Sequence, residues 1–123
     1  MRKIDHLNLK VKDIDKAIEF YTKTLGFTLT WKLIEENRKF AFLNDGTITY
    51  EIIEDKNFEN GTFDHIAYVS EDIYADFEHF KALDESMITC EVGFAPFLFE
   101  NGMYYFFIKG ANGEKIEFCQ RKA

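Results

Sequence analysis

The chain has 123 residues, a length typical of one domain, and its 46% hydrophobic and 30% charged residues are the composition of a globular protein rather than a disordered one. The net charge of −7 argues against nucleic acid or an anionic membrane surface as partner, because like charges repel. No apolar run approaches the roughly 20 residues that span a bilayer, and the first residues lack the apolar stretch of a signal peptide. We therefore expect a cytoplasmic protein.

The first half of the chain predicts one strand, one helix and three further strands. Residues 4–11 alternate between apolar and polar side chains, which places His6 and Asn8 on one face of a strand. Asp13 is a suitable helix cap, and Gly26 a suitable helix stop. Between them, apolar residues recur at helical spacing: Ile14, Ala17, Ile18, Tyr21 and Leu25. Three strands are expected near 27–35, 38–44 and 47–54, with a turn at 44–46.

The second half repeats this order. A strand is expected at about 63–70, and a helix begins after Asp72 with Ile73, Phe77 and Phe80 on its buried side. Three strands follow, with a turn at 111–113 that matches the turn at 44–46. Their ranges are about 87–93, 103–109 and 114–121. A polar linker at 55–61 joins the halves, and the second half carries an extra loop at 94–102.

Two dipeptides support an internal duplication. Asp5-His6 recurs as Asp64-His65, and Asp13-Ile14 recurs as Asp72-Ile73, each pair 59 residues further on. We therefore predict a single α+β domain over 1–123, built from two tandem βαβββ modules of about 1–57 and 61–123. The modules are expected to form a curved mixed sheet around a cleft, with the helices outside. The sequence contains no glycine-rich phosphate-binding motif.

Strand parity brings two histidines and two glutamates to the face that the helices do not cover. His6 and its repeat counterpart His65 lie opposite the apolar side chains of their strands. Glu51 and Glu117 do the same in the last strand of each half. A carboxylate within an apolar strand is costly unless it is solvated, paired or bound to metal. The four residues would suit one Ni²⁺, Co²⁺, Zn²⁺, Mn²⁺ or Fe²⁺ ion, although each alone is more often an ordinary polar residue.

The other chemically versatile side chains have ordinary interpretations. Cys90 and Cys119 lack metal or disulfide spacing, and we expect reduced thiols in or near the core. The third histidine, His79, is expected on the solvated side of the second helix.

At this point the sequence resembles the vicinal oxygen chelate superfamily, which includes glyoxalase I, bleomycin-resistance and fosfomycin-resistance proteins, extradiol dioxygenases and methylmalonyl-CoA epimerase. The resemblance covers nearly the whole chain. It is carried by residues 4–7, 13–21 running to 25–27, 64–68 and 113–118. These segments are more specific for the fold than for the reaction.

The resemblance implies roles for the four residues. His6, His65 and Glu117 match positions that resemble metal ligands in most metal-using branches. Glu51 distinguishes the branches, because a glutamate here looks like glyoxalase I. The fosfomycin-resistance proteins and dioxygenases use only three protein ligands, and the epimerase typically has glutamine at this position.

A glyoxalase-like reaction is what this ligand pattern implies. The metal chelates two neighbouring oxygens of a small substrate and stabilises an enediolate, as in lactoylglutathione lyase. A glutamate then moves a proton between adjacent carbons, with Glu117 the first choice for the base and Glu51 the second. Four aromatic residues could line an apolar substrate pocket, although core packing is the more common role for each: Trp31, Phe42, Tyr105 and Phe107. No glutathione-binding signature is found.

Two alternatives stay open. One is a fosfomycin-resistance-like enzyme that opens an epoxide. The other is a metal-free protein of the same fold that binds a small aromatic or cationic ligand. The modules could pair within one chain or across a homodimer.

Overall fold

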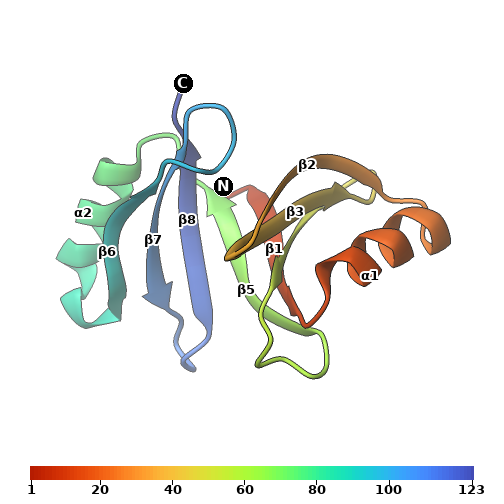
Figure 1. Ribbon diagram of the computed structural model, residues 1–123. Helices are drawn as coiled ribbons and strands as arrows, with labels where there is room; N and C mark the ends of the chain where they lie inside the picture. The colour runs from red at the N-terminus through yellow and green to blue at the C-terminus, as the bar shows by residue number, and fades with distance from the viewer. The chain divides into compact units, whose positions relative to one another are not determined.

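The computed structural model describes residues 1–123, which divide into two compact units (Figure 1). We call His6–Asp64 the first module, and His65–Ala123 together with Met1–Asp5 the second module. Each module follows the order strand, helix, three strands, so the predicted α+β class and the two βαβββ repeats are confirmed. None of the helices has the length and apolar character needed to cross a membrane.

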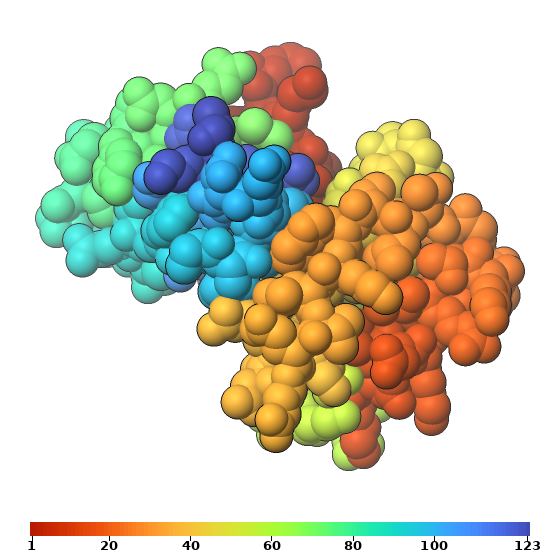
Figure 2. Space-filling view, turned by 45° about the horizontal axis from the view of Figure 1, so that its top comes forward, coloured from red at the N-terminus to blue at the C-terminus, as the bar shows by residue number.

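The first module has four strands in the order β2-β3-β4-β1. β1 and β4 pair in parallel, and the other neighbours pair antiparallel. Helix α1 covers one face of this sheet, where Ile14 packs with Leu9, Val11 and Ile52 in a buried core. The outer strand β2 lies at the surface in Figure 2. The bounds are β1 Ile4–Val11, α1 Ile14–Glu19, β2 Thr28–Glu35, β3 Arg38–Asn44 and β4 Thr49–Glu54.

The first helix ends in a π-helical turn that its apolar spacing does not predict. After α1, residues Phe20–Thr24 (η1) adopt this wider turn, and the Leu25 N–H donates to the carbonyl of Phe20 at 3.2 Å. A π turn rotates the following side chains out of the 3.6-residue period. Leu25, expected on the buried side, is consequently 49% exposed. Phe27 packs against the core together with Tyr21 instead.

The second module has the strand order β5-β8-β7-β6, with β5 and β8 parallel and the other pairs antiparallel. Helix α2 places Ile73 and Phe77 against Phe106 and Phe118 on one sheet face. A short 3-10 turn, η2, follows α2 and was not predicted. The bounds are β5 Thr62–Val69, α2 Ile73–Leu83, η2 Glu85–Met87, β6 Ile88–Ala95, β7 Met103–Lys109 and β8 Lys115–Arg121.

Both helices begin with the same two hydrogen bonds. The side chains of Asp13 and Asp72 cap α1 and α2 by accepting backbone N–H groups three residues on, each at 3.1 Å. The last strand of each module supplies a second acceptor: Glu54 for the N–H of Ile14 and Gln120 for that of Ile73. These acceptors satisfy N–H groups that have no partner within the helix. They also connect each helix to the strand that carries Glu51 or Glu117.

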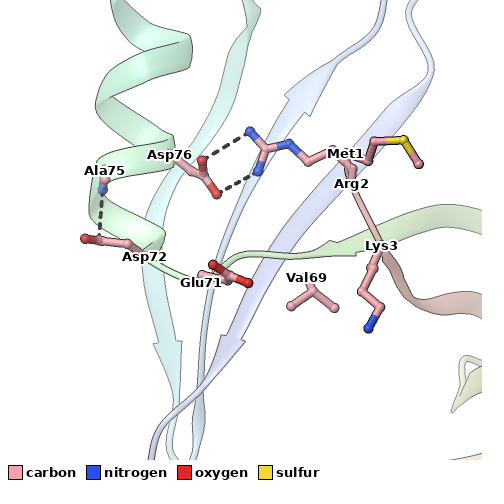
Figure 3. A pocket seen from close by; sticks show the side chains of 8 residues that line it. All are labelled: Met1, Arg2, Lys3, Val69, Glu71, Asp72, Ala75 and Asp76. Atoms are coloured by element: carbon pink, nitrogen blue, oxygen red, sulfur yellow. Dashed lines mark hydrogen bonds and ion pairs between the residues drawn. The ribbon is translucent and has the colours of Figure 1, made fainter.

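The N-terminal segment belongs to the second module because Arg2 holds it there. The guanidinium of Arg2 donates to both carboxylate oxygens of Asp76 on α2, at 2.9 and 3.1 Å, as Figure 3 shows. It also lies over the rings of Phe80 and Phe118. Burial alone would raise the pKa of Asp76, but hydrogen bonds from Arg2 and Ser70 outweigh it and lower that pKa.

We predict that Asp76→Asn lowers the free energy of unfolding at neutral pH. Because the folded pKa of Asp76 lies below its ordinary value, the pair stabilises the fold above that value, and the benefit disappears as the pH falls through the folded pKa. A bidentate, partly exposed pair contributes about 1 kcal/mol. Urea unfolding at pH 7 and at about pH 3 should show a smaller loss at pH 3 than at pH 7.

The matched variant is Arg2→Gln, which removes the other partner. The double variant should lose less than the sum of the two single variants, since each of these already removes the Arg2–Asp76 pair. Fully additive losses would show that Arg2 and Asp76 stabilise the fold separately.

Candidate functional site

The first module contains one of two histidine–glutamate pairs. His6 on β1 is fully buried, and Glu51 on β4 is 4% exposed. The Nε2 atom of His6 lies 3.4 Å from Oε1 of Glu51. The neighbours of Glu51 in β4, Tyr50 and Ile52, pack in the core beneath α1, so Glu51 points to the opposite sheet face. This is the placement that strand parity predicts.

Glu51 is also held by a buried amide. Asn8 lies directly across from Glu51 in the parallel β1–β4 pair and is fully buried. Its Nδ2 donates to Oε1 of Glu51 at 2.7 Å, and its Oδ1 accepts from Nζ of Lys10 at 3.0 Å. An ammonium group can only donate, so Lys10 requires the amide oxygen on its side and turns the NH₂ toward Glu51. Lys10 in turn lies 4.0 Å from Asp64.

The second module carries the equivalent pair. His65 on β5 and Glu117 on β8 have side chains only 5% and 6% exposed, and Nε2 of His65 lies 2.9 Å from Oε1 of Glu117. The residue across from Glu117 in the parallel β5–β8 pair is Ala67. Ala67 therefore occupies the position that Asn8 has in the first module, and its methyl group offers no hydrogen bond. The edge of the His65 ring meets Phe107 at 5.1 Å between centroids.

The donor atoms of each pair suit a divalent metal ion. Imidazole nitrogen and carboxylate oxygen are ligands for Zn²⁺, Ni²⁺, Co²⁺, Mn²⁺ and Fe²⁺. Two such ligands at right angles around an ion lie roughly 3 Å apart, since each bond is close to 2.1 Å. The observed separations of 3.4 and 2.9 Å bracket that value. Each pair could thus supply two ligands with small adjustments of its side chains.

The four aromatic residues suggested as pocket lining have different surroundings. Phe42 is 1% exposed and contacts the rings of His6 and Trp31 in the first module. Tyr105 and Phe107 line an open cavity in the second module. Their contact with a substrate stays a prediction.

The remaining candidates are the two cysteines and the third histidine. Cys90 and Cys119 are free thiols, and Cys119 is buried. Burial raises the pKa of the Cys90 thiol, and the charge of Glu117 raises it further, against a smaller lowering by Lys115. A thiol that stays protonated at neutral pH is a poor nucleophile. His79 is exposed on α2, as expected.

Comparison with known proteins places this arrangement in a family. Residues 3–118 match the model of the Glyoxalase/Bleomycin resistance protein/Dioxygenase superfamily. Protein YwbC of Bacillus subtilis is 35% identical over 128 residues, with 98% of both chains covered. The lactoylglutathione lyase of Haemophilus influenzae is 34% identical over 129 residues, covering 96% of this chain and 92% of the lyase.

A solved structure shows the same fold at lower identity. A variant of the methylmalonyl-CoA epimerase of Streptomyces coelicolor is similar with a TM-score of 0.79 and 20% identity, and 98% of each chain is covered. This likeness concerns the fold alone.

We predict that Asn8 and Glu51 are energetically coupled. Asn8→Leu keeps the side-chain size but leaves a buried carboxylate without its amide donor, which should cost about 1–3 kcal/mol in the free energy of unfolding. The measurement is urea unfolding of metal-stripped Asn8→Leu, Glu51→Met and the double variant.

The double variant should be less destabilised than the sum of the two single variants, with a coupling of at least about 1 kcal/mol. The matched control combines Ala67→Gly with Glu117→Met at the equivalent positions of the second module, where the effects should add because the alanine methyl group makes no hydrogen bond. Additive effects in the first module would show that the Asn8–Glu51 hydrogen bond contributes nothing measurable.

Proposed function

Because the chain belongs to the glyoxalase/bleomycin resistance protein/dioxygenase superfamily, we propose that it is a divalent-metal-dependent lyase or isomerase of the glyoxalase type. Its substrate is a small molecule with oxygens on neighbouring carbons. The buried carboxylate of Glu51 beside His6, repeated by Glu117 beside His65, carries this proposal. The 34% identity to a lactoylglutathione lyase supports the same reaction class.

In this proposal His6, Glu51, His65 and Glu117 together hold one divalent ion. The two pairs meet either within one chain or between the chains of a homodimer. When bound, the ion supplies a Lewis acid that polarises the neighbouring substrate oxygens. A bound cation would also explain why two carboxylates are buried among aromatic and apolar residues, because it compensates the cost of burying their charge.

The two glutamates have separate roles in this proposal. Glu51 is held by the Asn8 amide, which in turn is oriented by Lys10, so it acts as a fixed ligand. Glu117 stands across from Ala67, which provides no comparable amide. Glu117 is therefore the better candidate for the base that takes a proton from one substrate carbon and returns it to the next.

The alternative reactions make different demands on Glu51. A fosfomycin-resistance-like enzyme with three protein ligands has no need of a carboxylate there, and a metal-free binding protein needs none of the four residues for metal. The buried Asn8–Glu51–His6 contacts favour the four-ligand proposal.

We predict that the purified protein binds about one Ni²⁺, Co²⁺, Zn²⁺ or Mn²⁺ per chain. Glu51→Gln should weaken that binding at least about tenfold, because it removes a ligand. Metal content after dialysis, with titration in the presence of a competing chromophoric chelator, measures both quantities. Exposed Glu78 provides the control variant Glu78→Gln, which should bind like the wild type.

Less than about 0.1 metal per chain after reconstitution would contradict the proposal. Unchanged metal affinity in Glu51→Gln would instead favour the three-ligand alternative.

We predict that the metal-loaded protein isomerises the hemithioacetal of methylglyoxal with a thiol. Glutathione and cysteine, tested as the thiol, distinguish a large conjugate from a small one. Glu117→Gln should lower turnover by about 10²- to 10⁴-fold, since it removes the base. A variant with metal bound and turnover unchanged would remove Glu117 from that role.

A further inference from the structure

The second module contains a groove on the same sheet face as the His65–Glu117 pair. Strands β6, β7 and β8 enclose a cavity of about 680 Å³. On this face β7 presents Tyr105 and Phe107, while Phe106 and Ile108 pack under α2 on the other face. The groove is lined by Thr89, Cys90, Tyr105, Phe107, Lys109 and Lys115, and Ile108 and Gly113 complete the lining.

One residue that lines the groove is a direct neighbour of the candidate catalytic carboxylate. Phe107 lies directly across from Glu117 in the antiparallel β7–β8 pair, and its ring contacts the ring of His65. A molecule that rests on Phe107 therefore reaches the His65–Glu117 pair without leaving the second module.

Two lysines face each other at the far end of the groove. Lys109 on β7 and Lys115 on β8 are direct cross-strand partners, and both are exposed. Like charges in directly opposite positions of a sheet destabilise it. Lys115 also lies over the Phe107 ring, with its Nζ 4.9 Å from the ring centre. The two ammonium groups thus make a local positive site on a chain of net charge −7.

The acidic side chains of the adjacent turns are committed to local hydrogen bonds. Asp84 accepts from the backbone and hydroxyl of Ser86, at 3.0 and 2.6 Å. Hydrogen bonds from Ser86 lower the pKa of Asp84, and the charge of Lys109 adds a smaller contribution. Glu114 accepts from the backbone N–H of Asn112 at 2.9 Å. Both carboxylates keep their negative charge, and these hydrogen bonds hold them at their turns, so they reduce the positive potential of the groove without occupying it.

We propose that the groove binds an anionic group of the substrate, a carboxylate or a phosphate, between Lys109 and Lys115. The flat or apolar part of the molecule lies on Phe107 and Tyr105. Lys115 and Glu117 are two residues apart on β8, which corresponds to about 6.6 Å. The anion and the reacting carbons therefore belong to one small molecule. The claim that the substrate reacts at Glu117 rests on the proposed function. The claim that the two lysines bind an anion does not.

The test measures anion binding without metal. Phenylacetate, phenyl phosphate and the neutral phenylacetamide are titrated into metal-stripped protein at low salt, and dissociation constants are taken from ¹H–¹⁵N chemical shifts of the β7–β8 strands. Both anions have a ring for Phe107 and a charge for the lysines. We expect at least one anion to bind about tenfold more tightly than the amide. Whichever anion binds more tightly identifies the group as carboxylate or phosphate.

Variants of the two lysines test whether Lys109 and Lys115 are the residues that bind the anion. Lys109→Gln and Lys115→Gln should each weaken anion binding about threefold to fivefold, and the double variant about tenfold or more. The dissociation constant of phenylacetamide should be the same in these variants as in the wild type. Lys23→Gln removes the same charge from an exposed position in the first module and should bind anions like the wild type.

Two results would overturn the inference: equal binding of the amide and the anions by the wild type, or unchanged anion binding in the double lysine variant. Neither depends on metal. A protein that prefers the anions but takes up no metal would keep this binding site and lose the proposed function. A protein that takes up metal but does not prefer the anions would keep the proposed function and lose this binding site.

Discussion

The buried histidine–glutamate pair is the constraint around which each module is organised. A buried carboxylate loses most of its hydration, and a fold tolerates that loss only where other groups replace the water. In the first module the partners of Glu51 are the His6 ring and the Asn8 amide. In the second module the partner of Glu117 is His65 at 2.9 Å. The rest of each module places these side chains on one sheet face and directs a helix to the other.

That division of the sheet follows from parallel pairing of the first and last strands. In both modules the residue two positions after the histidine lies across from the glutamate: Asn8 from Glu51, and Ala67 from Glu117. Three residues after each glutamate, the same strand caps the helix, through Glu54 or Gln120. One short strand therefore presents the functional carboxylate on one face and anchors the helix at its end. A shift of register by one residue would misplace both features.

Much of this could be predicted from the sequence, because it depends on local patterns. Alternation in residues 4–11, the caps at Asp13 and Asp72 and the repeated Asp-His dipeptide indicate the elements and the faces of the four polar residues. The π turn could not be predicted, since apolar spacing assumes 3.6 residues per turn, and so Leu25 was misplaced. Asn8 was placed on the correct face, but its bond to Glu51 depends on the register of β1 with β4. The opposed lysines were missed because exposed lysines are ordinary in a sequence.

The lysine pair also changes what the overall charge implies. A net charge of −7 describes the field far from the protein, where it repels anions. Within a groove, interactions over a few ångströms dominate, since salt screens charges beyond about 8–10 Å. A small anion that enters the β6–β8 groove therefore meets Lys109 and Lys115 at short range, although the chain as a whole is acidic. A long anionic polymer would contact that surface along its whole length. The proposed anion site is thus compatible with the net charge, which still disfavours a nucleic acid.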